Sequence, residues 1–416
     1  MSENFSYDDN RLCIDGLPLA DIVQRFNTPT YVYSHAALTE AYKSFAQAFA
    51  ARPGTLVCYA VKANPNLAIL SLFARLGAGF DIVSGGELQR VISVGGAMSK
   101  VVFSGVGKSV YEIRMALEAE ILCFNVESEA ELLRINEVAG HMHRIAPISL
   151  RVNPDVDAKT HPYISTGLKK NKFGVAYSEA RALYRRAAGL PNIRIVGMDC
   201  HIGSQLTEAS PFVAAAEKVL ALADQLAADG IVLEHLDLGG GLGIRYDDET
   251  PPSVVEYAQA LMNALRGRSE RLIVEPGRAL VGNAGVLLTR VEYLKEGEEK
   301  NFAIVDAAMN DLMRPALYDA WHGVQPVQRH PDVAARSYEV VGPVCETGDF
   351  LAHDRELALL QGDVLAIMSA GAYGMSMSSN YNTRPRAAEV LVREGEALLI
   401  RERESLRSVF AGERVV

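Results

Sequence analysis

Short apolar runs alternate with longer amphipathic stretches along most of the chain, from about Thr55 onward. The short runs are typical of buried strands, whereas stretches in which apolar residues recur every three or four positions are typical of helices. The pattern predicts strands at Leu56–Val61, Phe80–Val83, Val101–Ser104, Leu122–Val126, Ile148–Val152, Ile193–Cys200, Glu234–Leu238 and Leu272–Val274. It predicts helices between them at Leu67–Leu76, Gly86–Val94, Val110–Glu118, Glu129–Ala139 and Pro211–Asp229.

This alternation indicates an α/β fold in which parallel strands are joined by helical crossovers. Eight such units in about 225 residues match the size of a (β/α)8 (TIM) barrel. An open doubly wound sheet would show the same periodicity. The barrel is favoured because polar and glycine residues follow the strands, at the carboxyl ends where barrel enzymes collect their active sites. These residues are Lys62, Asp81, Asn125, Arg151, His201, Gly239–Gly241 and Glu275.

After Arg278 the pattern changes to short β-like segments separated by Gly, Pro and Asp turns, with few helical crossovers. We expect a second, mainly antiparallel domain, a β-sandwich or barrel-like fold, which the stretch Arg11–Leu17 helps to complete. The predicted division is a barrel at residues 36–279 and a β domain at residues 1–35 and 280–416. The long irregular stretch Asn153–Phe173 is typical of a lid or a disordered loop.

Composition narrows the classes of protein to consider. The chain has 416 residues, of which 49% are hydrophobic and 22% charged, as expected for a soluble globular protein of two domains. A net charge of −10 without a basic block makes nucleic acid and anionic membranes poor partners. No apolar run approaches the roughly 18 residues of a membrane span. No signal peptide is expected, because Met1–Asn10 is polar and acidic.

The 5 cysteines are scattered and include no C-x-x-C pair, which suits neither a disulfide framework nor a zinc site. They fit a reducing compartment, so we expect a cytoplasmic protein without a metal site.

Lys62 ends a predicted buried strand in Tyr59–Asn64. A lone lysine at such a place usually extends to solvent. A desolvated lysine, by contrast, has a lowered pKa and can form a Schiff base with an aldehyde. The glycine run Gly239–Gly241 could cradle a phosphate with its backbone N–H groups or form a tight turn. It does not match a dinucleotide fingerprint, because Ile244 stands where that motif needs glycine.

Glu275 follows the last predicted barrel strand, three residues before Arg278. Its charge could keep a proton on a pyridine nitrogen, or it could form a structural ion pair with Arg278. His201 could stack on an aromatic ring and Ser204 could reach a phosphate. A locally hydrogen-bonded histidine is the ordinary alternative.

Taken in order, Tyr59–Asn64, His201–Ser204, Gly239–Gly243 and Glu275–Arg278 resemble the motifs of the alanine-racemase-like, pyridoxal-phosphate-dependent decarboxylases. The resemblance runs from about Thr28 to about Glu389. It implies a barrel followed by a β domain, a Schiff base at Lys62 and a homodimer with shared active sites. It also implies that pyridoxal 5'-phosphate is bound by Lys62, Asp81, His201, Ser204, Gly239, Gly240, Gly241, Glu275, Gly277, Arg278 and Tyr373.

Motifs in the second half, together with the loop Lys159–Gly167, resemble the members of this family that act on a diamino dicarboxylic acid. These motifs are Met309–Tyr318 and Gly342–Asp349, in which Glu346 stands where ornithine decarboxylases usually carry aspartate. The implied reaction releases CO2 from meso-2,6-diaminoheptanedioate and forms L-lysine, the last step of lysine biosynthesis. Cys345 is implied as the proton donor.

A substrate with a distal amine and carboxylate needs a fork-shaped cation and an anion. The implied substrate-binding residues are Arg278, Arg314, Tyr318, Glu346 and Tyr373. Tyr318 could share a face with Arg314 if their segment is helical. The ordinary alternatives are surface ion pairing for Arg314, burial as a small apolar residue for Cys345 and packing in a glycine turn for Tyr373.

Other functions stay open on the sequence. One is a related decarboxylase acting on arginine, ornithine or carboxynorspermidine, and another is a racemase, which would release no CO2. A non-catalytic pyridoxal-phosphate-binding protein is the third. Such a protein should lack the second domain, so the Cys345–Glu346 segment argues against it.

Overall fold

The computed structural model describes residues 4–156 and 171–416. The predicted lid and the Lys159–Gly167 motif therefore lie largely or wholly outside the described residues. The chain divides into two compact units. We call Ala41–Ile244 with Thr250–Ala279 the barrel unit, and Met1–Glu40 with Arg245–Glu249 and Leu280–Val416 the β unit.

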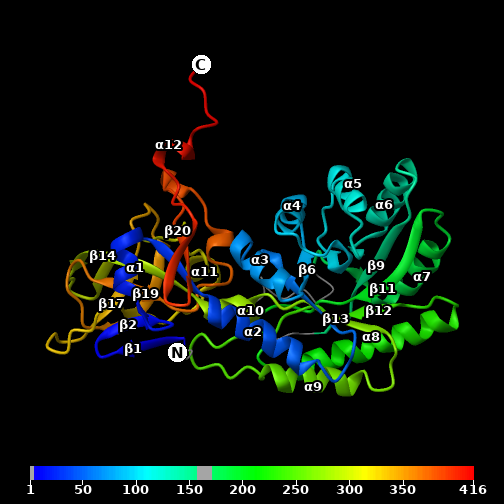
Figure 1. The fold of residues 1–416 in the computed structure, drawn as a ribbon, viewed down its shortest axis with the longest axis horizontal. Coiled ribbons are helices and arrows are strands. Elements are labelled where there is room, and N and C mark those ends of the chain that lie inside the picture. Colours follow the sequence, from blue (N-terminus) through cyan, green and yellow to red (C-terminus); the bar gives the residue numbers. More distant parts are fainter. Residues whose placement is uncertain (1–3, 157–170) are drawn as a thin grey trace. The chain divides into compact units, whose positions relative to one another are not determined.

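The barrel unit is built on a closed ring of parallel strands (Figure 1). The ring closes because the last strand pairs with the first, which confirms the predicted barrel and rules out an open sheet. The interior-facing core includes Cys58 and Cys123 as well as aliphatic residues. In ring order the strands are β5 (Leu56–Ala60), β6 (Gly79–Ile82), β7 (Val101–Phe103), β8 (Cys123–Val126), β9 (Ala146–Asn153), β11 (Ile193–Asp199), β12 (His235–Asp237) and β13 (Arg271–Val274); the short β10 (Val175–Ala176) pairs with β9.

Helices connect the strands, and Figure 1 shows α5, α6 and α7 on the outside of β9 and β11. Several begin at a polar residue whose side chain accepts a backbone N–H, with reciprocal capping boxes at Ser109 and Ser253. All five predicted helices are present. The helices of this unit are the second part of α2 (His35–Ala48), α3 (Leu67–Arg75), α4 (Gly85–Ser93), α5 (Val110–Ala119), α6 (Glu129–His141), α7 (Tyr177–Ala188), α8 (Ser210–Ala228) and α9 (Val254–Ala264).

The β unit contains a large sheet in which most neighbouring strands are antiparallel, as predicted, while the pairs β15–β17 and β4–β20 are parallel. The sheet order is β18 (Phe350–Leu357), β17 (Arg336–Val341), β15 (Asn301–Val305), β14 (Gly285–Lys295), β4 (Thr30–Ser34), β20 (Ala388–Arg393) and β21 (Glu396–Arg401), with β19 (Val364–Ile367) pairing with both β14 and β16 (Val324–Pro326). The unit also contains α1 (Leu19–Phe26), α11 (Arg314–Tyr318) and α12 (Leu406–Val409), and α10 (Arg278–Val281) begins in the barrel unit.

Arg11–Leu17 belongs to the β unit, as expected from the sequence. Arg11–Leu17 lies in a separate three-stranded sheet of β1 (Phe5–Asp8), β2 (Arg11–Ile14) and β3 (Leu17–Pro18), whose apolar residues pack on the β-unit core. The strand that enters the large sheet is β4, between β14 and β20. All five residues of β4 are buried, which suits a central position, whereas Arg11 is exposed.

Among the described residues, no helix has the length and apolar character needed to cross a membrane.

Candidate active site

The amine of Lys62 lies at the carboxyl end of the barrel strands. Strand β5 ends at Ala60, and a turn of 3-10 helix over Val61–Ala63 carries Lys62 directly beyond it. Lys62 Nζ lies 2.7 Å from Oδ2 of Asp81, which belongs to the neighbouring strand β6 and is fully buried. The lysine is therefore held by a carboxylate at the strand ends and does not simply extend to solvent.

Three buried carboxyl groups converge close to this edge. One oxygen each from Asp199, Asp237 and Glu275 lies within 4.8 Å of the others. Asp237 Oδ1 accepts the N–H of Gly239 at 2.9 Å. Among the described residues no donor reaches Glu275 Oε1 or Asp237 Oδ2.

Burial and the charges of its neighbours favour the neutral form of the Glu275 carboxyl group. Burial, then repulsion from Asp237 and Asp81, raises the pKa of Glu275 well above its usual value. Burial also raises the pKa of Asp237 to about 7. A cationic ring N–H would supply the donor that Glu275 Oε1 lacks, so Glu275 fits a pyridine nitrogen.

The glycine run beside Glu275 has no room for side chains. A Cβ on Gly240 would lie 2.0 Å from the carbonyl oxygen of Glu275, and one on Gly241 would lie 2.5 Å from that of Gly203. Gly239 and Gly241 have φ of +66° and +116°, a backbone region that glycine adopts without strain. The bare backbone of this run fits the predicted phosphate cradle.

His201 and Ser204 lie next to the glycine run. The N–H of Gly240 donates to His201 Nδ1 at 3.1 Å, which fixes the imidazole ring. Burial, aided by the positive charges of Arg151 and Lys62, lowers the pKa of His201 well below its usual value. The ring is therefore neutral and suited to stacking on an aromatic face.

A cation and a hydroxyl group meet at Ser204. Buried Arg278 donates from Nη2 to Ser204 Oγ at 3.0 Å. Gly277 lets this segment approach β5, because a Cβ there would lie 3.1 Å from Ala60 Cβ. No ion pair among the described residues joins Arg278 to Glu275, so the structure does not support this alternative for Glu275. The Arg278–Ser204 pair can instead bind an anion.

In the β unit, Arg314 opens helix α11, which ends at Tyr318, so the helical segment on which the shared-face prediction depended is present. Arg314 is buried, and its contacts among the described residues include a histidine and a tyrosine. The surface-ion-pair alternative is therefore wrong.

Cys345 and Glu346 are exposed in the turn between β17 and β18. The backbone N–H of Cys345 donates to Asn382 Oδ1 at 3.0 Å, and Glu346 Oε2 accepts from Tyr381 Oη at 3.3 Å. The alternative of a buried structural cysteine is wrong. Tyr373 has φ of +54°, which is uncommon for an aromatic residue and typical of functional sites.

The predicted residues thus form two sets. Lys62, Asp81, His201, Ser204, Gly239–Gly241, Glu275, Gly277 and Arg278 belong to the barrel unit, whereas Arg314, Tyr318, Cys345, Glu346 and Tyr373 belong to the β unit. The sequence interpretation did not include Asp199 and Asp237 among the site residues. Both end apolar strands, the same signal that singled out Asp81.

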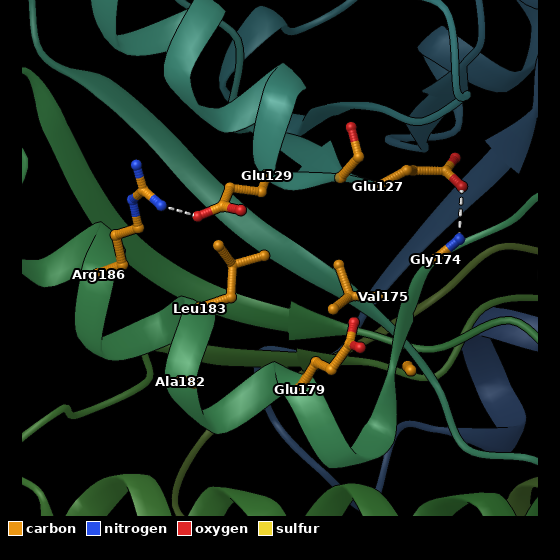
Figure 2. A pocket seen from close by; sticks show the side chains of 10 residues that line it. Glu127, Glu129, Gly174, Val175, Glu179, Ala182, Leu183 and Arg186 are labelled. Atoms are coloured by element: carbon orange, nitrogen blue, oxygen red, sulfur yellow. Dashed lines mark hydrogen bonds and ion pairs between the residues drawn. The ribbon is translucent and has the colours of Figure 1, made fainter.

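A cavity of about 640 Å³ lies elsewhere on the barrel unit, between α6 and α7 (Figure 2). Its lining includes Glu127, Glu129, Glu179 and Arg186 but none of the predicted site residues. Glu127 already accepts the N–H groups of Gly105 and Gly174 and pairs with Arg151. The carboxylate of Glu127 therefore has a structural role in the barrel wall.

Comparison with known proteins agrees with this geometry. The model of the pyridoxal-dependent decarboxylase pyridoxal binding domain matches residues 35–282. The diaminopimelate decarboxylase of Pseudomonas aeruginosa is 59% identical over 414 residues, covering 100% of this chain and 99% of that protein. That of Neisseria meningitidis serogroup B is 60% identical and covers 97% of each. The solved M. jannaschii diaminopimelate decarboxylase in co-complex with L-lysine has a TM-score of 0.95, 41% identity and coverage of 100% and 98%.

Proposed function

This chain belongs to the diaminopimelate decarboxylases, a family of pyridoxal-dependent enzymes, and from that membership we propose that it converts meso-2,6-diaminoheptanedioate to L-lysine and CO2. The reaction makes it a carboxy-lyase of lysine biosynthesis with pyridoxal 5'-phosphate as cofactor. The observation that carries this function is the cluster at the carboxyl ends of the barrel strands. It combines an amine held by Asp81, a neutral imidazole, a bare glycine run and a buried Glu275 oxygen that no donor of the described residues reaches.

Each residue of the barrel set has a distinct task toward the cofactor. Lys62 would attach it covalently, His201 would stack on its ring and Glu275 would accept its pyridine N–H. When bound, pyridoxal phosphate takes up the electron pair that CO2 leaves behind. Asp81 orients the Lys62 amine through their 2.7 Å contact. The cofactor phosphate would be held by the barrel residues Ser204, Gly239, Gly240, Gly241, Gly277 and Arg278, and we propose that Tyr373 of the β unit also takes part.

The distal end of the substrate carries a carboxylate and an ammonium group. We assign the carboxylate to Arg278 and Arg314, because guanidinium groups bind carboxylates through paired N–H donors. The ammonium group is assigned to Glu346, an exposed carboxylate of the β unit. Tyr318 and Tyr373 complete the substrate-binding set. Recognition at this end selects a substrate with both charges.

Cys345 returns the proton that completes the reaction. The carboxylate leaves as CO2, and the Cys345 Sγ–H proton is transferred to Cα in its place. The thiolate then regains a proton from solvent. A proton donor must hold its proton until this step.

Cys345 and Glu346 are exposed in the single chain. We propose a head-to-tail homodimer in which both reach the cofactor of the neighbouring subunit. A two-fold interface of this kind creates two equal composite sites.

We also place the enzyme in the cytoplasm. The structure pairs none of the cysteines Cys13, Cys58, Cys123, Cys200 and Cys345 in a disulfide, in keeping with a reducing compartment.

The test is CO2 release from a panel of diaminopimelate, ornithine, arginine and carboxynorspermidine. We expect release from diaminopimelate to exceed the others by at least about a hundredfold in kcat/KM, since a mispaired buried charge costs roughly 2–5 kcal/mol. Arg314→Ala should lose most of this activity while keeping the cofactor absorbance. Arg336→Ala, which removes an exposed arginine of β17, is the matched control. Equal release from ornithine would refute the assignment.

A further inference from the structure

Arg314 is enclosed by two aromatic rings of the β unit. Its Nη1 lies 2.7 Å from Nε2 of His322, a residue with no exposed surface. Its guanidinium carbon lies 4.3 Å from the centre of the Tyr246 ring. The two rings contact each other edge to face, with centroids 5.2 Å apart. The orientation of this buried guanidinium is thus determined by named neighbours.

The contacts of His322 determine its tautomer. Nδ1 lies 2.8 Å from the carbonyl oxygen of Met368, which can only accept a hydrogen bond, so Nδ1 carries the proton. In a neutral imidazole the other nitrogen is then an acceptor. Arg314 can only donate, so it needs an acceptor at Nε2. The Met368 carbonyl and Arg314 therefore both require the tautomer with the proton on Nδ1. His322 therefore accepts one N–H of Arg314 while its own N–H is held by the backbone.

The Tyr246 ring supports the guanidinium from another direction. Tyr246 belongs to the short segment Arg245–Glu249, where Glu249 Oε2 accepts the N–H groups of Tyr246 and Asp247 at 3.0 and 2.7 Å. A guanidinium over an aromatic face is attracted by the ring quadrupole. Tyr246 thus limits the movement of Arg314, while His322 sets the direction of one N–H.

We propose that His322 is a positioning residue that orients Arg314 to receive the distal carboxylate of the substrate. The inference rests on the proposed function, in which Arg314 binds that carboxylate. A charged fork held in one orientation loses less conformational freedom on binding, which favours affinity. In this role His322 acts through Arg314.

Two substitutions separate the nitrogens of His322. In His322→Asn the side-chain amide can still donate to Met368 but provides nothing at the position of Nε2. In His322→Gln the longer side chain brings an amide oxygen to that position, where it can accept from Arg314. We therefore expect His322→Gln to restore the hydrogen bond that Arg314 loses in His322→Asn.

The readout uses two probes that differ only in the distal carboxylate. L-lysine, the product, retains this group, and cadaverine lacks it. In His322→Asn we expect the inhibition constant of L-lysine and the KM for diaminopimelate to rise about tenfold or more, the effect of losing a hydrogen bond to a charged group. The inhibition constant of cadaverine and kcat should change by less than about twofold, and His322→Gln should restore lysine binding.

His330→Asn is the matched control, because His330 belongs to the same unit and contacts Asp363. Unchanged lysine inhibition in a folded His322→Asn protein would overturn the proposal, as would an equal loss for cadaverine. If the Asn variant does not fold, His322→Gln decides: retained lysine binding supports an acceptor at Nε2, and a tenfold loss refutes it. A wild-type enzyme that releases no CO2 from diaminopimelate refutes the proposed function instead.

Discussion

At the scale of the residue, buried charges and their neighbours define what each side chain can do. Lys62 has a carboxylate partner, whereas Glu275 carries a buried oxygen without a donor. The Lys62 amine therefore suits an electrophilic carbon of a ligand, and the Glu275 carboxyl group suits a cationic ring nitrogen of the same ligand. The neutral state of His201 follows from burial and from two nearby cations.

The first prediction concerns Lys62. The purified protein should absorb at roughly 420 nm, as a pyridoxal group bound to lysine does. Borohydride should fix the cofactor on Lys62, and peptide mass spectrometry should find it there. Lys62→Ala should lose this label, while Lys100→Ala, which removes a surface lysine, should keep it. Cofactor trapped on another lysine in Lys62→Ala would contradict the assignment.

The second prediction concerns Asp311, a buried carboxyl group of the β unit. Burial raises its pKa to about 7, although the N–H of Ala308 and the charge of Arg384 act in the opposite direction. The unfolded chain releases this proton at about pH 3.9. Between these values the folded state binds more protons, so the contribution of Asp311 to stability falls as the pH rises from about 4 to 7.

Asparagine at this position keeps an acceptor for Ala308 but does not ionise. Asp311→Asn should therefore be more stable than the wild type at pH 8, by at most roughly 4 kcal/mol, and show little difference at pH 4. Thermal unfolding midpoints measured across this range test the prediction. Asp332→Asn removes an exposed aspartate of the same unit as a control. A constant difference between variant and wild type would show that ionisation of Asp311 is not involved.

At the scale of the element, the segments after the barrel strands hold the site together. The glycine run after β12 packs on the backbone after β13 and on the loop after β11. Its backbone can approach these neighbours so closely because it carries no Cβ. The glycine run that we propose as the phosphate cradle therefore also packs against the backbone of Glu275.

The third prediction tests this packing with Gly240→Ala. The added Cβ would lie 2.0 Å from the Glu275 carbonyl oxygen, so the backbone must move. We expect a loss of more than about 1 kcal/mol in stability and weaker retention of pyridoxal phosphate on dialysis. Gly86→Ala in α4 is the control, because its Cβ would meet only Ser84 Oγ at 3.7 Å. Normal cofactor retention in Gly240→Ala would show that the loop tolerates displacement.

At the scale of the whole molecule, the proposed catalytic residues are divided between two units. Lys62 belongs to the barrel unit and Cys345 to the β unit, where it is exposed. The proposed dimer supplies Cys345 from one subunit to Lys62 of the other, so every active site would need two chains.

The fourth prediction follows from this division. Lys62→Ala and Cys345→Ala proteins, each nearly inactive, are mixed under conditions that exchange subunits. In a heterodimer one site collects both defects and the other is intact, so random exchange should restore about a quarter of the wild-type activity. Mixing Lys62→Ala with Lys62→Ala/Cys345→Ala should restore none. If exchange is demonstrated and the first mixture also stays inactive, the shared site is wrong.

Much of this protein follows from local sequence. The alternation of strands and helices predicted the barrel because the periods of buried strands and amphipathic helices are local properties. Contiguous motifs likewise identified Lys62, the glycine run and Glu275 as candidate site residues. A residue that follows a strand in the sequence stays at the end of that strand, however the strands assemble. The change of pattern after Arg278 predicted a mainly antiparallel β domain.

Only the tertiary structure decided which distant residues meet. Strand β4 enters the large sheet between β14 and β20, while Arg11–Leu17 forms part of a separate sheet of the same unit, because strand pairing depends on burial after assembly. The convergence of Asp199 with Asp237 and the contact of Arg314 with Tyr246 depend on how segments far apart in the chain pack together. No local pattern encodes such contacts, because they join positions whose separation along the chain says nothing about their separation in space.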